Sequence, residues 1–471
     1  MMNAAQSNSN SSAVVCVQGL GFVGMAMALA TASARRPDGT PAFEVVGVEL
    51  DNDAGRERVA SVNDGRLPIQ SSDQRMETAM QEATAAGNLR ATTDPAAYGD
   101  ASVAIVDVGL DVTMTDEGPT VDFSGLRAAV RSLAERLPAG ALVIVETTVP
   151  PGTCEKVIAP EIDGAVEERG LPPGSILLAH AYERVMPGPQ YLDSIVNYWR
   201  VYAGHTPEAA EACERFLSQV VNVEEYPLTR LGSTTASETA KVLENSYRAM
   251  NIAFMEEWGR FAEEADIDLF EAIDAIRMRP THANIRQPGF GVGGYCLTKD
   301  PLFAEYGARE LLGFKDLEFP FSERAVEVNK VMPLVSLDKL DELLDGLGGR
   351  RVLLLGVSYR EGVADMREAP AGIFLGEAKR RGAEVVAQDP LVGGRRLPEG
   401  DEVQAELPSP DGFDAVVFAV GHAQYQELDI PKWLGSSRAV VVDASRVLTD
   451  DQLSALASEG RTVWSVGRGL V

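Results

Sequence analysis

The spacing of apolar residues divides the chain into two segments with short apolar runs and a helical segment between them. Short runs that are rich in β-branched residues and bounded by Gly, Asp or Pro predict buried strands. Such runs lie within residues 13–17, 43–50, 101–109 and 141–153, and again within 351–359, 383–390, 414–420 and 439–445. Helical stretches separate the runs, so each outer segment is expected to form a mostly parallel sheet with helices on its faces.

From about Glu208 onward the pattern predicts helices, and the most regular helical stretch is Ser237–Ala265. Four large apolar residues recur in this stretch at helical spacing: Met250, Phe254, Trp258 and Phe261. Such a stripe is typical of a helix that packs on a core or on a second subunit.

Three polar residues share another face of the same expected helix. Lys241, Asn245 and Arg248 are spaced at i, i+4 and i+7, which places them on one side. A solvated helix surface would explain this spacing, and so would a polar site.

Together the patterns predict an α/β fold in which two Rossmann-like doubly wound domains are joined by a central helical domain. The polar, uncharged residues 1–12 are expected to form a disordered tail. The expected domains are residues 13–207, which bind a dinucleotide, residues 208–330, which form the helical centre, and residues 331–471, which form the second α/β domain.

A glycine motif follows the first apolar run. It reads Gly19-Leu20-Gly21-Phe22-Val23-Gly24 and leads into an alanine-rich helical stretch. In this context the first glycine permits the turn, the second lets the backbone approach a pyrophosphate, and the third lets the helix pack on the strand. The motif therefore predicts a bound dinucleotide.

Two side chains at expected strand ends are candidates for the same region. Glu49 ends the second run, where an acid suits the ribose hydroxyls of NAD and repels the extra phosphate of NADP; an ordinary strand-end carboxylate is the alternative. Thr148 follows a later run, at the sheet edge where ligands bind. It is a candidate for touching cofactor or substrate, or else a turn hydroxyl that bonds its own backbone.

Composition narrows the possible partners. The chain has 471 residues, 45% of them hydrophobic, and a formal net charge of −28. That charge argues against nucleic acid and anionic membranes as partners. The start of the chain lacks the features of a signal peptide, and no apolar run reaches the roughly 18 residues of a membrane helix, so a cytoplasmic protein is expected. Only eight of the 42 basic residues are lysines, which is compatible with a high-salt cytoplasm or with nucleotide bias.

The four cysteines and four histidines are scattered, so neither a disulfide framework nor a metal site is expected. Three of the cysteines are expected to be inert buried thiols. Cys296 differs because it stands in Gly291–Pro301, after Gly293 and Gly294 and just before Lys299 and Asp300. The stretch is either a glycine turn with a buried thiol or a nucleophile placed within reach of a substrate carbon.

In order along the chain, these motifs resemble the UDP-glucose/GDP-mannose dehydrogenase family of nucleotide-sugar dehydrogenases. The matching segments are 19–24, 63–69, 146–153, 183–188, 241–254, 291–301, 356–370, 388–390 and 467–469. Any one segment is a weak signal, and the order and spacing of all of them carry the resemblance.

The resemblance implies a 6-phosphogluconate-dehydrogenase-like central domain with a dimerisation helix, a C-terminal domain that binds the nucleotide sugar, and a homodimer. It also implies a four-electron oxidation of the C6 alcohol of the sugar to a carboxylate with two NAD in turn. A thiolate that adds to the intermediate aldehyde gives a thiohemiacetal, which can yield the second hydride and leave a thioester for hydrolysis. By resemblance, that thiolate belongs to Cys296.

Other roles are implied in the same way. Lys241 and Asn245 resemble residues that stabilise oxyanions at C6, and Asp300 resembles an aspartate that tunes Cys296 and Lys241. Thr148 and Glu183 resemble residues that place water or move protons for hydrolysis. The implied substrate contacts are Glu183, Arg184, Lys241, Asn245, Gly293, Gly294, Tyr359 and Arg367. The two glycines are expected to give the sugar room.

The chain departs from the family pattern at several positions. Residues 108–111 replace a turn that normally carries a hydroxyl near the cofactor, which puts NAD affinity in question. The segment 183–188 favours an N-acetylhexosamine, whereas Lys299 favours glucose or mannose. The substrate is therefore expected to be a UDP-N-acetylhexosamine or UDP-glucose, with GDP-mannose third, and the product a precursor for surface polysaccharide.

Two other classes remain open from the sequence. A two-electron β-hydroxyacid dehydrogenase would use a Lys and an Asn on the central helix, but it would need neither the cysteine nor a second α/β domain. A non-catalytic binder of sugar nucleotides would explain the altered turn at residues 108–111 and would not need to keep Cys296.

Overall fold

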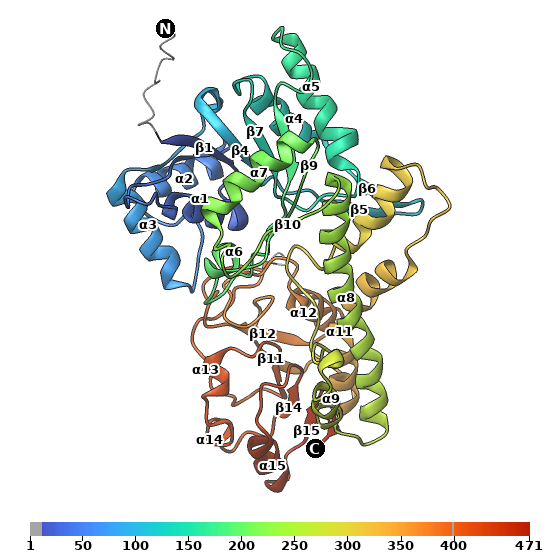
Figure 1. The fold of residues 1–471 in the computed structure, drawn as a ribbon. Coiled ribbons are helices and arrows are strands. Elements are labelled where there is room, and N and C mark those ends of the chain that lie inside the picture. Colours follow the sequence, from blue (N-terminus) through green and yellow to red (C-terminus); the bar gives the residue numbers. More distant parts are fainter. Residues whose placement is uncertain (1–11, 398–399) are drawn as a thin grey trace, which may run out of the picture. The chain divides into compact units, whose positions relative to one another are not determined.

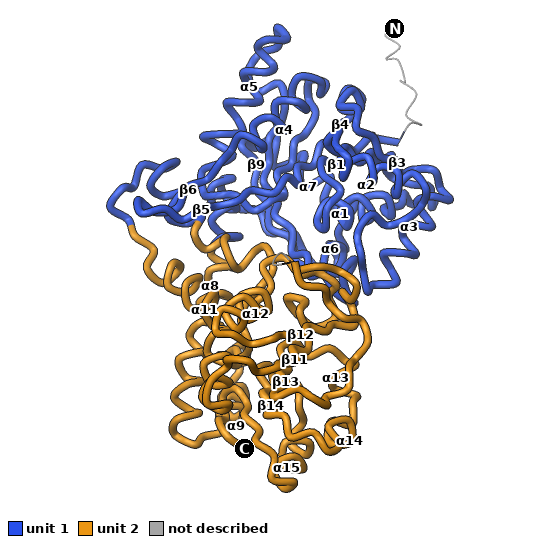
Figure 2. The backbone as a smooth tube through the Cα atoms, turned by 180° about the vertical axis from the view of Figure 1, so that it is seen from behind, with its two compact units in different colours: residues 1–242, 303–317 blue, residues 243–302, 318–471 orange. Residues whose placement is uncertain are grey.

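The computed structural model describes residues 12–397 and 400–471 and contains two compact units (Figures 1 and 2). The first runs to Val242 and includes Phe303–Leu317, and the second comprises Leu243–Leu302 and Glu318–Val471. Residues 1–11 of the expected tail lie outside the described residues. The domain boundaries at 207 and 330 stay predictions.

The first unit is built on an eight-stranded sheet with the order β10-β9-β8-β7-β4-β1-β2-β3. Neighbouring strands are parallel except β8 and β9. The strand bounds are β1 (Ala13–Gln18), β2 (Phe43–Val48), β3 (Leu89–Thr92), β4 (Ala101–Val106), β7 (Leu142–Val145), β8 (Leu177–His180), β9 (Val201–Gly204) and β10 (Thr229–Arg230). A separate hairpin joins β5 (Val112–Thr115) to β6 (Gly118–Val121).

Helices cover both faces of this sheet. The strand side chains that point to either face are apolar, so both faces need to be buried. Val15 and Val17 of β1 pack in one core and Cys16 packs in the other. The helices of this unit are α1 (Phe22–Ser33), α2 (Asp53–Asn63), α3 (Gln74–Ala86), α4 (Ser124–Ala134), α5 (Ala159–Glu168), α6 (Asp193–Val196), α7 (Pro207–Val220) and α10 (Phe303–Tyr306), with shorter turns at η1 (Pro95–Asp100), η2 (Cys154–Ile158) and η5 (Gly307–Leu311).

The second unit contains a six-stranded sheet with the order β12-β11-β13-β14-β15-β16, parallel except for the last pair. The strands are β11 (Arg351–Leu355), β12 (Glu384–Gln388), β13 (Ala415–Phe418), β14 (Val440–Asp443), β15 (Val463–Ser465) and β16 (Gly469–Leu470). Alternate residues of β11 again pack in two different cores. The helices are α9 (Leu269–Arg277), α11 (Pro320–Leu343), α12 (Pro370–Arg380), α13 (Ala423–Gln426), α14 (Ile430–Leu434) and α15 (Asp450–Ser458), with turns at η3 (Pro280–His282) and η4 (Asp300–Leu302).

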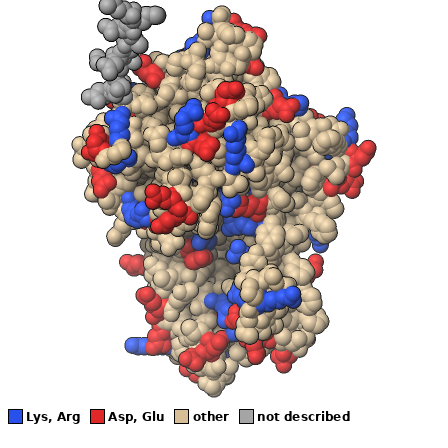
Figure 3. Space-filling model, viewed as in Figure 1, with Lys and Arg blue, Asp and Glu red and all other residues tan. Residues whose placement is uncertain are grey.

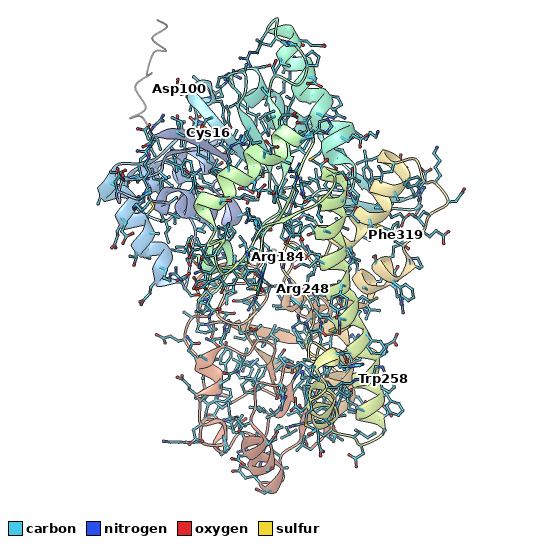
Figure 4. All side chains as sticks on the ribbon, viewed as in Figure 1. Cys16, Asp100, Arg184, Arg248, Trp258 and Phe319 are labelled. Atoms are coloured by element: carbon cyan, nitrogen blue, oxygen red, sulfur yellow. The ribbon has the colours of Figure 1, made fainter. Side chains whose placement is uncertain are left out.

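The long helix α8 (Thr234–Glu264) begins in the first unit and continues in the second. Its apolar stripe does not pack in a core: Phe254 is 50% exposed, Trp258 45% and Phe261 57%. Figure 4 marks Trp258 on this helix. Of the two expectations for the stripe, core packing is therefore wrong. On the polar face Lys241 and Asn245 are buried, whereas Arg248 is exposed.

The predicted fold class is confirmed, because two parallel α/β sheets flank a helical central segment in the sequence. Every strand expected from an apolar run is present. Acidic and basic side chains are interspersed on the face drawn in Figure 3. In the described part of the chain, no helix combines the length and the apolar character needed to cross a membrane.

Candidate functional site

The glycine loop between β1 and α1 has the geometry of a pyrophosphate cradle. Gly19 has a φ of +90°, which favours glycine. A Cβ on Gly24 would lie 1.8 Å from the carbonyl oxygen of Gly19, so only glycine lets α1 start this close to the strand. No atom lies within 4 Å of the position that a Cβ would take on Gly21. The backbone of Gly21 is therefore open to a ligand. These residues fit a dinucleotide.

Glu49 lies at the end of β2, beside this loop. Its Oε1 accepts a hydrogen bond from the backbone N–H of Leu20 at 2.6 Å and pairs with Arg58 at 3.1 Å. The carboxylate therefore braces the glycine loop in addition to the ribose contact that the sequence predicts for it.

The two loop glycines give a matched pair of predictions. Gly24→Ala should lower the melting temperature by several degrees, because its methyl group overlaps a backbone oxygen and overpacking costs about 1–3 kcal/mol. Gly21→Ala should leave the melting temperature unchanged and weaken NAD binding about tenfold, because its methyl group occupies the side that faces the pyrophosphate. Thermal unfolding and an NAD titration check both, and equal melting temperatures for the two variants would contradict this assignment.

Lys241 is buried on α8 and contacts the segment that follows β8. Its Nζ donates to the carbonyl oxygen of Glu183 at 3.0 Å and lies 3.2 Å from Glu183 Oε1. The Tyr182 ring centroid is 5.4 Å from the same nitrogen. Arg184 lies outside this pair and stacks against Tyr182 and Tyr198 instead. The structure thus brings Lys241 and Glu183 together.

His180 at the end of β8 was not singled out by its sequence. Its Nδ1 lies 2.8 Å from the hydroxyl oxygen of Ser237, one helical turn before Lys241. Burial, and then the charge of Lys241, lowers the pKa of His180 to about 3, so the ring is neutral at physiological pH. Thr148, which follows β7, is half-buried in the same unit.

Cys296 is exposed, whereas Cys16, Cys154 and Cys213 are buried. Burial raises the pKa of Cys16 and of Cys213 to about 12 and also raises the pKa of Cys154, so these three stay unreactive thiols. The expectation of three inert buried cysteines agrees with this burial.

The two glycines before Cys296 fit closely against the segment after β11. A Cβ on Gly293 would lie 2.7 Å from the carbonyl oxygen of Glu368 and 2.8 Å from the Tyr359 Cβ. Gly294 has a φ of +81°, and its N–H donates to the carbonyl oxygen of Arg367 at 3.1 Å. Close packing therefore explains why both positions are glycine. The sequence suggests a second reason, which is room for a sugar.

A buried polar network supports the turn that carries Cys296. Asp300 accepts a hydrogen bond from Asn245 Nδ2 at 2.7 Å and pairs with Lys299 Nζ at 2.8 Å. The Asp300 N–H donates to the carbonyl oxygen of Cys296 at 2.9 Å, and Lys299 lies 4.2 Å from the Tyr295 ring centroid. Asp300 thus ties the cysteine turn to α8 within the second unit.

A cavity of about 470 Å³ opens in the second unit at the carboxyl ends of β11, β13 and β14. The strand order turns between β11 and β13, so the cavity lies at the switch point where α/β sheets bind ligands. Tyr359 lines it together with three cations, Arg286, Arg360 and Arg446. Three guanidinium groups around a polar cavity suit a diphosphate.

Arg367 does not line this cavity. It pairs with Asp365 through Nε and Nη2, at 2.9 Å and 2.7 Å from Oδ2. Its carbonyl oxygen holds Gly294, so in this structure Arg367 supports the cysteine loop. Its predicted contact with a nucleotide sugar stays a prediction.

The second sheet lacks an open phosphate loop for a physical reason. The Asp389 carboxylate, after β12, accepts hydrogen bonds from the N–H groups of Val357 and Ser358 at 2.8 Å and 2.9 Å. Burial alone would raise the pKa of Asp389, but hydrogen bonds from His422 and these N–H groups lower it to about 2. The groups that could bind a pyrophosphate at this turn are already occupied.

Sequence profiles of one family match all three parts of the chain. The NAD binding domain of the UDP-glucose/GDP-mannose dehydrogenase family matches residues 13–221, its central domain residues 235–331, and its UDP binding domain residues 353–450.

Individual known proteins are similar to this chain along most of its length. UDP-N-acetyl-D-mannosamine dehydrogenase of Methanocaldococcus jannaschii is 30% identical over 415 residues, 88% of this chain and 87% of that protein. NDP-N-acetyl-D-galactosaminuronic acid dehydrogenase of Ralstonia nicotianae is 29% identical over 435 residues, 91% and 94% of the two chains. The solved structure of UDP-D-ManNAc dehydrogenase from Pyrococcus horikoshii is 28% identical with a TM-score of 0.81, and covers 97% of this chain and 99% of that one. The predicted resemblance, enzyme class and cofactor are confirmed: the chain belongs to the UDP-glucose/GDP-mannose dehydrogenase family and is an NAD-dependent oxidoreductase.

Proposed function

We propose that the protein oxidises the C6 alcohol of a UDP-N-acetylhexosamine to the uronic acid in two steps through Cys296. The observation that carries this proposal is that Cys296 alone of the four cysteines is exposed, on a turn anchored by the buried Asp300. A thiol kept only for packing would be buried like the other three.

The reaction balances as R-CH₂OH + 2 NAD⁺ + H₂O → R-COO⁻ + 2 NADH + 3 H⁺. NAD supplies the hydride acceptor for both oxidations. The Cys296 sulfur bonds to the aldehyde carbon, the adduct loses a hydride to give a thioester, and water releases the carboxylate and the thiol. Lys241 and Asn245 stabilise negative charge on the C6 oxygen, and Glu183 and Thr148 place the water or accept its proton.

The nucleotide part of the substrate is assigned to the cavity of the second unit. Tyr359 offers an aromatic wall, and Arg286, Arg360 and Arg446 offer cations for the diphosphate. The relatives named above act, by their names, on N-acetylated sugars, which supports this sugar class over UDP-glucose and GDP-mannose. The product would serve as a polysaccharide precursor, and the cytoplasmic location stays a prediction.

A panel of UDP-N-acetylmannosamine, UDP-N-acetylglucosamine, UDP-N-acetylgalactosamine, UDP-glucose and GDP-mannose tests the assignment, with products identified by mass spectrometry. The expected result is a uronic acid from at least one N-acetylated sugar, with a higher kcat/KM than for the others. A preference for UDP-glucose or GDP-mannose would overturn the sugar class, an aldehyde product would indicate a two-electron enzyme, and binding without any product would favour the non-catalytic alternative.

We also propose a homodimer formed through the exposed stripe of α8, which consists of Leu243, Tyr247, Met250, Phe254, Trp258 and Phe261. These side chains are 38–65% exposed, and a contiguous apolar patch of this kind marks an interaction surface. The period of the stripe suits packing against a second helix.

Trp258→Asp should convert the dimer to a monomer, because the buried stripe would then hold an unpaired charge. Light scattering after size-exclusion chromatography checks this. Gln219→Asp, which adds the same charge to an exposed position of α7, should stay dimeric. A wild-type protein that is already monomeric at micromolar concentration would contradict the proposal.

A further inference from the structure

The first unit contains five ionisable side chains grouped beyond the carboxyl edge of its sheet. Glu146 and Arg200 are completely or almost completely buried, and Glu183 and Lys241 are 6% and 7% exposed. Asp107, which directly follows β4, belongs to the same group because the charges of Glu183 and Arg200 act on it. Its residue as a whole is partly exposed, but both of its carboxyl oxygens are buried.

Four of the five side chains form two pairs. Arg200 contacts the Glu146 carboxylate, and Lys241 pairs with Glu183 at 3.2 Å. Among residues 12–397 and 400–471, neither carboxyl oxygen of Asp107 has a hydrogen-bond partner. The group therefore holds three carboxyls and two cations, so the carboxyls exceed the cations by one; Arg200 contacts Glu146 and also acts through its charge on Asp107.

A surplus buried carboxyl keeps its proton, because ionisation would place an unpaired charge in a medium of low dielectric. Burial, and then the charge of Glu183, raises the pKa of Asp107 well above its ordinary value, against a smaller opposing effect of Arg200. The charges that act on Asp107 come from Glu183, which follows β8, and Arg200, which precedes β9; Glu146 follows β7 and Lys241 lies on α8.

Asp107 lies directly behind the glycine loop. Its carbonyl oxygen is 3.1 Å from the position that a Cβ would take on Gly19, and its Oδ2 is 3.3 Å from that position on Gly24. Its N–H donates to the carbonyl oxygen of Gln18 at 3.1 Å. The side chain thus lies between the end of β1 and the start of α1, behind the backbone that receives the pyrophosphate.

We propose that Asp107 is a positioning residue of the NAD site that must stay a neutral carboxylic acid, and that loss of its proton weakens dinucleotide binding. A carboxylate behind this loop would repel the negative charges of the pyrophosphate through the intervening protein. At an effective dielectric constant of about 20, a repulsion between unit charges about 6–12 Å apart weakens binding by about 10- to 100-fold. The inference rests on NAD as the cofactor and is independent of Cys296.

Direct titration of the wild-type protein with NAD⁺ across pH tests the proposal, with Asp107→Asn as the permanently neutral variant. At neutral pH the dissociation constants of the two proteins for NAD⁺ should lie within about threefold of one another. As pH rises through the ionisation of Asp107, the wild-type constant should increase by about tenfold per unit until it reaches its plateau. The constant for Asp107→Asn should not follow this rise. Asp116→Asn, an exposed change in the β5–β6 hairpin, should behave like the wild type.

Two measurements keep the test decisive if Asp107→Asn folds poorly. An infrared spectrum of the wild type should show a protonated carboxyl at neutral pH that the variant lacks. Calorimetry in buffers of different ionisation enthalpy should show that NAD⁺ binding takes up protons near the pH of its ionisation. Absence of the protonated carboxyl signal at neutral pH would overturn the proposal. So would an NAD⁺ affinity that stays constant while rising pH removes the signal. A pH profile of NAD⁺ binding in Asp107→Asn that matches the wild-type profile would also overturn it.

Discussion

Replacing Cys296 with serine is expected to lower the rate of uronic acid formation by at least about 10³-fold. A serine hydroxyl is a far weaker nucleophile than a thiolate, and an ester is cleaved less readily than a thioester, so both later steps lose their covalent route. The fold should be unaffected, because the side chain is exposed. Product analysis by mass spectrometry, together with the melting temperature, checks the result.

Cys213→Ala is the matched control. It removes a buried thiol in the core of the first unit, so it should cost some stability and leave kcat nearly unchanged. If Cys296→Ser kept more than a tenth of the wild-type rate of uronic acid formation, the covalent route would be wrong and Cys296 would be a surface thiol without a role.

Lys241→Met is expected to reduce kcat by about 10²–10³-fold, because it removes the cation assigned to the developing charge at C6. It should also destabilise the first unit by about 3–5 kcal/mol, since Glu183 would remain buried without its partner. Steady-state kinetics and denaturant unfolding separate the two effects.

The double variant Lys241→Met with Glu183→Gln distinguishes catalysis from stability, because it removes both charges of the buried pair. It should recover most of the lost stability and none of the lost kcat. Lys156→Met, at an exposed position of the same unit, should change neither. Recovery of kcat in the double variant would show that Lys241 acts only through the stability of the fold.

The fold could be predicted largely from the sequence, because its strands are short apolar runs and its first turn is a glycine motif. The strands that were not expected are the short ones, such as β9 and β10, and the β5–β6 hairpin, where apolar and polar residues follow no clear period. The long helix α8 has the expected extent within three residues at its start. Its exposed stripe needed the structure, because helical spacing alone does not distinguish a core from an interface.

The candidate site was predicted in part. Its residue types and order pointed to Cys296, Lys241 and Asp300, but not to their partners. The pairing of Lys241 with Glu183 and of Asp300 with Asn245 joins residues more than 50 positions apart, which no local pattern reveals. Asp107 was missed for the same reason, since a strand-end aspartate is unusual only when the described residues around it bury its carboxyl oxygens and offer them no hydrogen bond.

The cations of the nucleotide cavity were missed as well. Arg286, Arg360 and Arg446 come from three distant loops that the second sheet brings together at its carboxyl edge. A sequence in which most basic residues are arginines gives no reason to select these three. Lysines were easier to select because they are rare, and two of the eight, Lys241 and Lys299, are buried in polar networks.

The most direct test of the central claim is the number of NADH molecules formed for each sugar nucleotide consumed by the wild-type protein. NADH can be followed by its absorbance while the remaining substrate is counted by chromatography in the same reaction, at low and at high salt. The account predicts two NADH per sugar and a uronic acid as the end product. One NADH per sugar, with an aldehyde or ketone as the product, would contradict it.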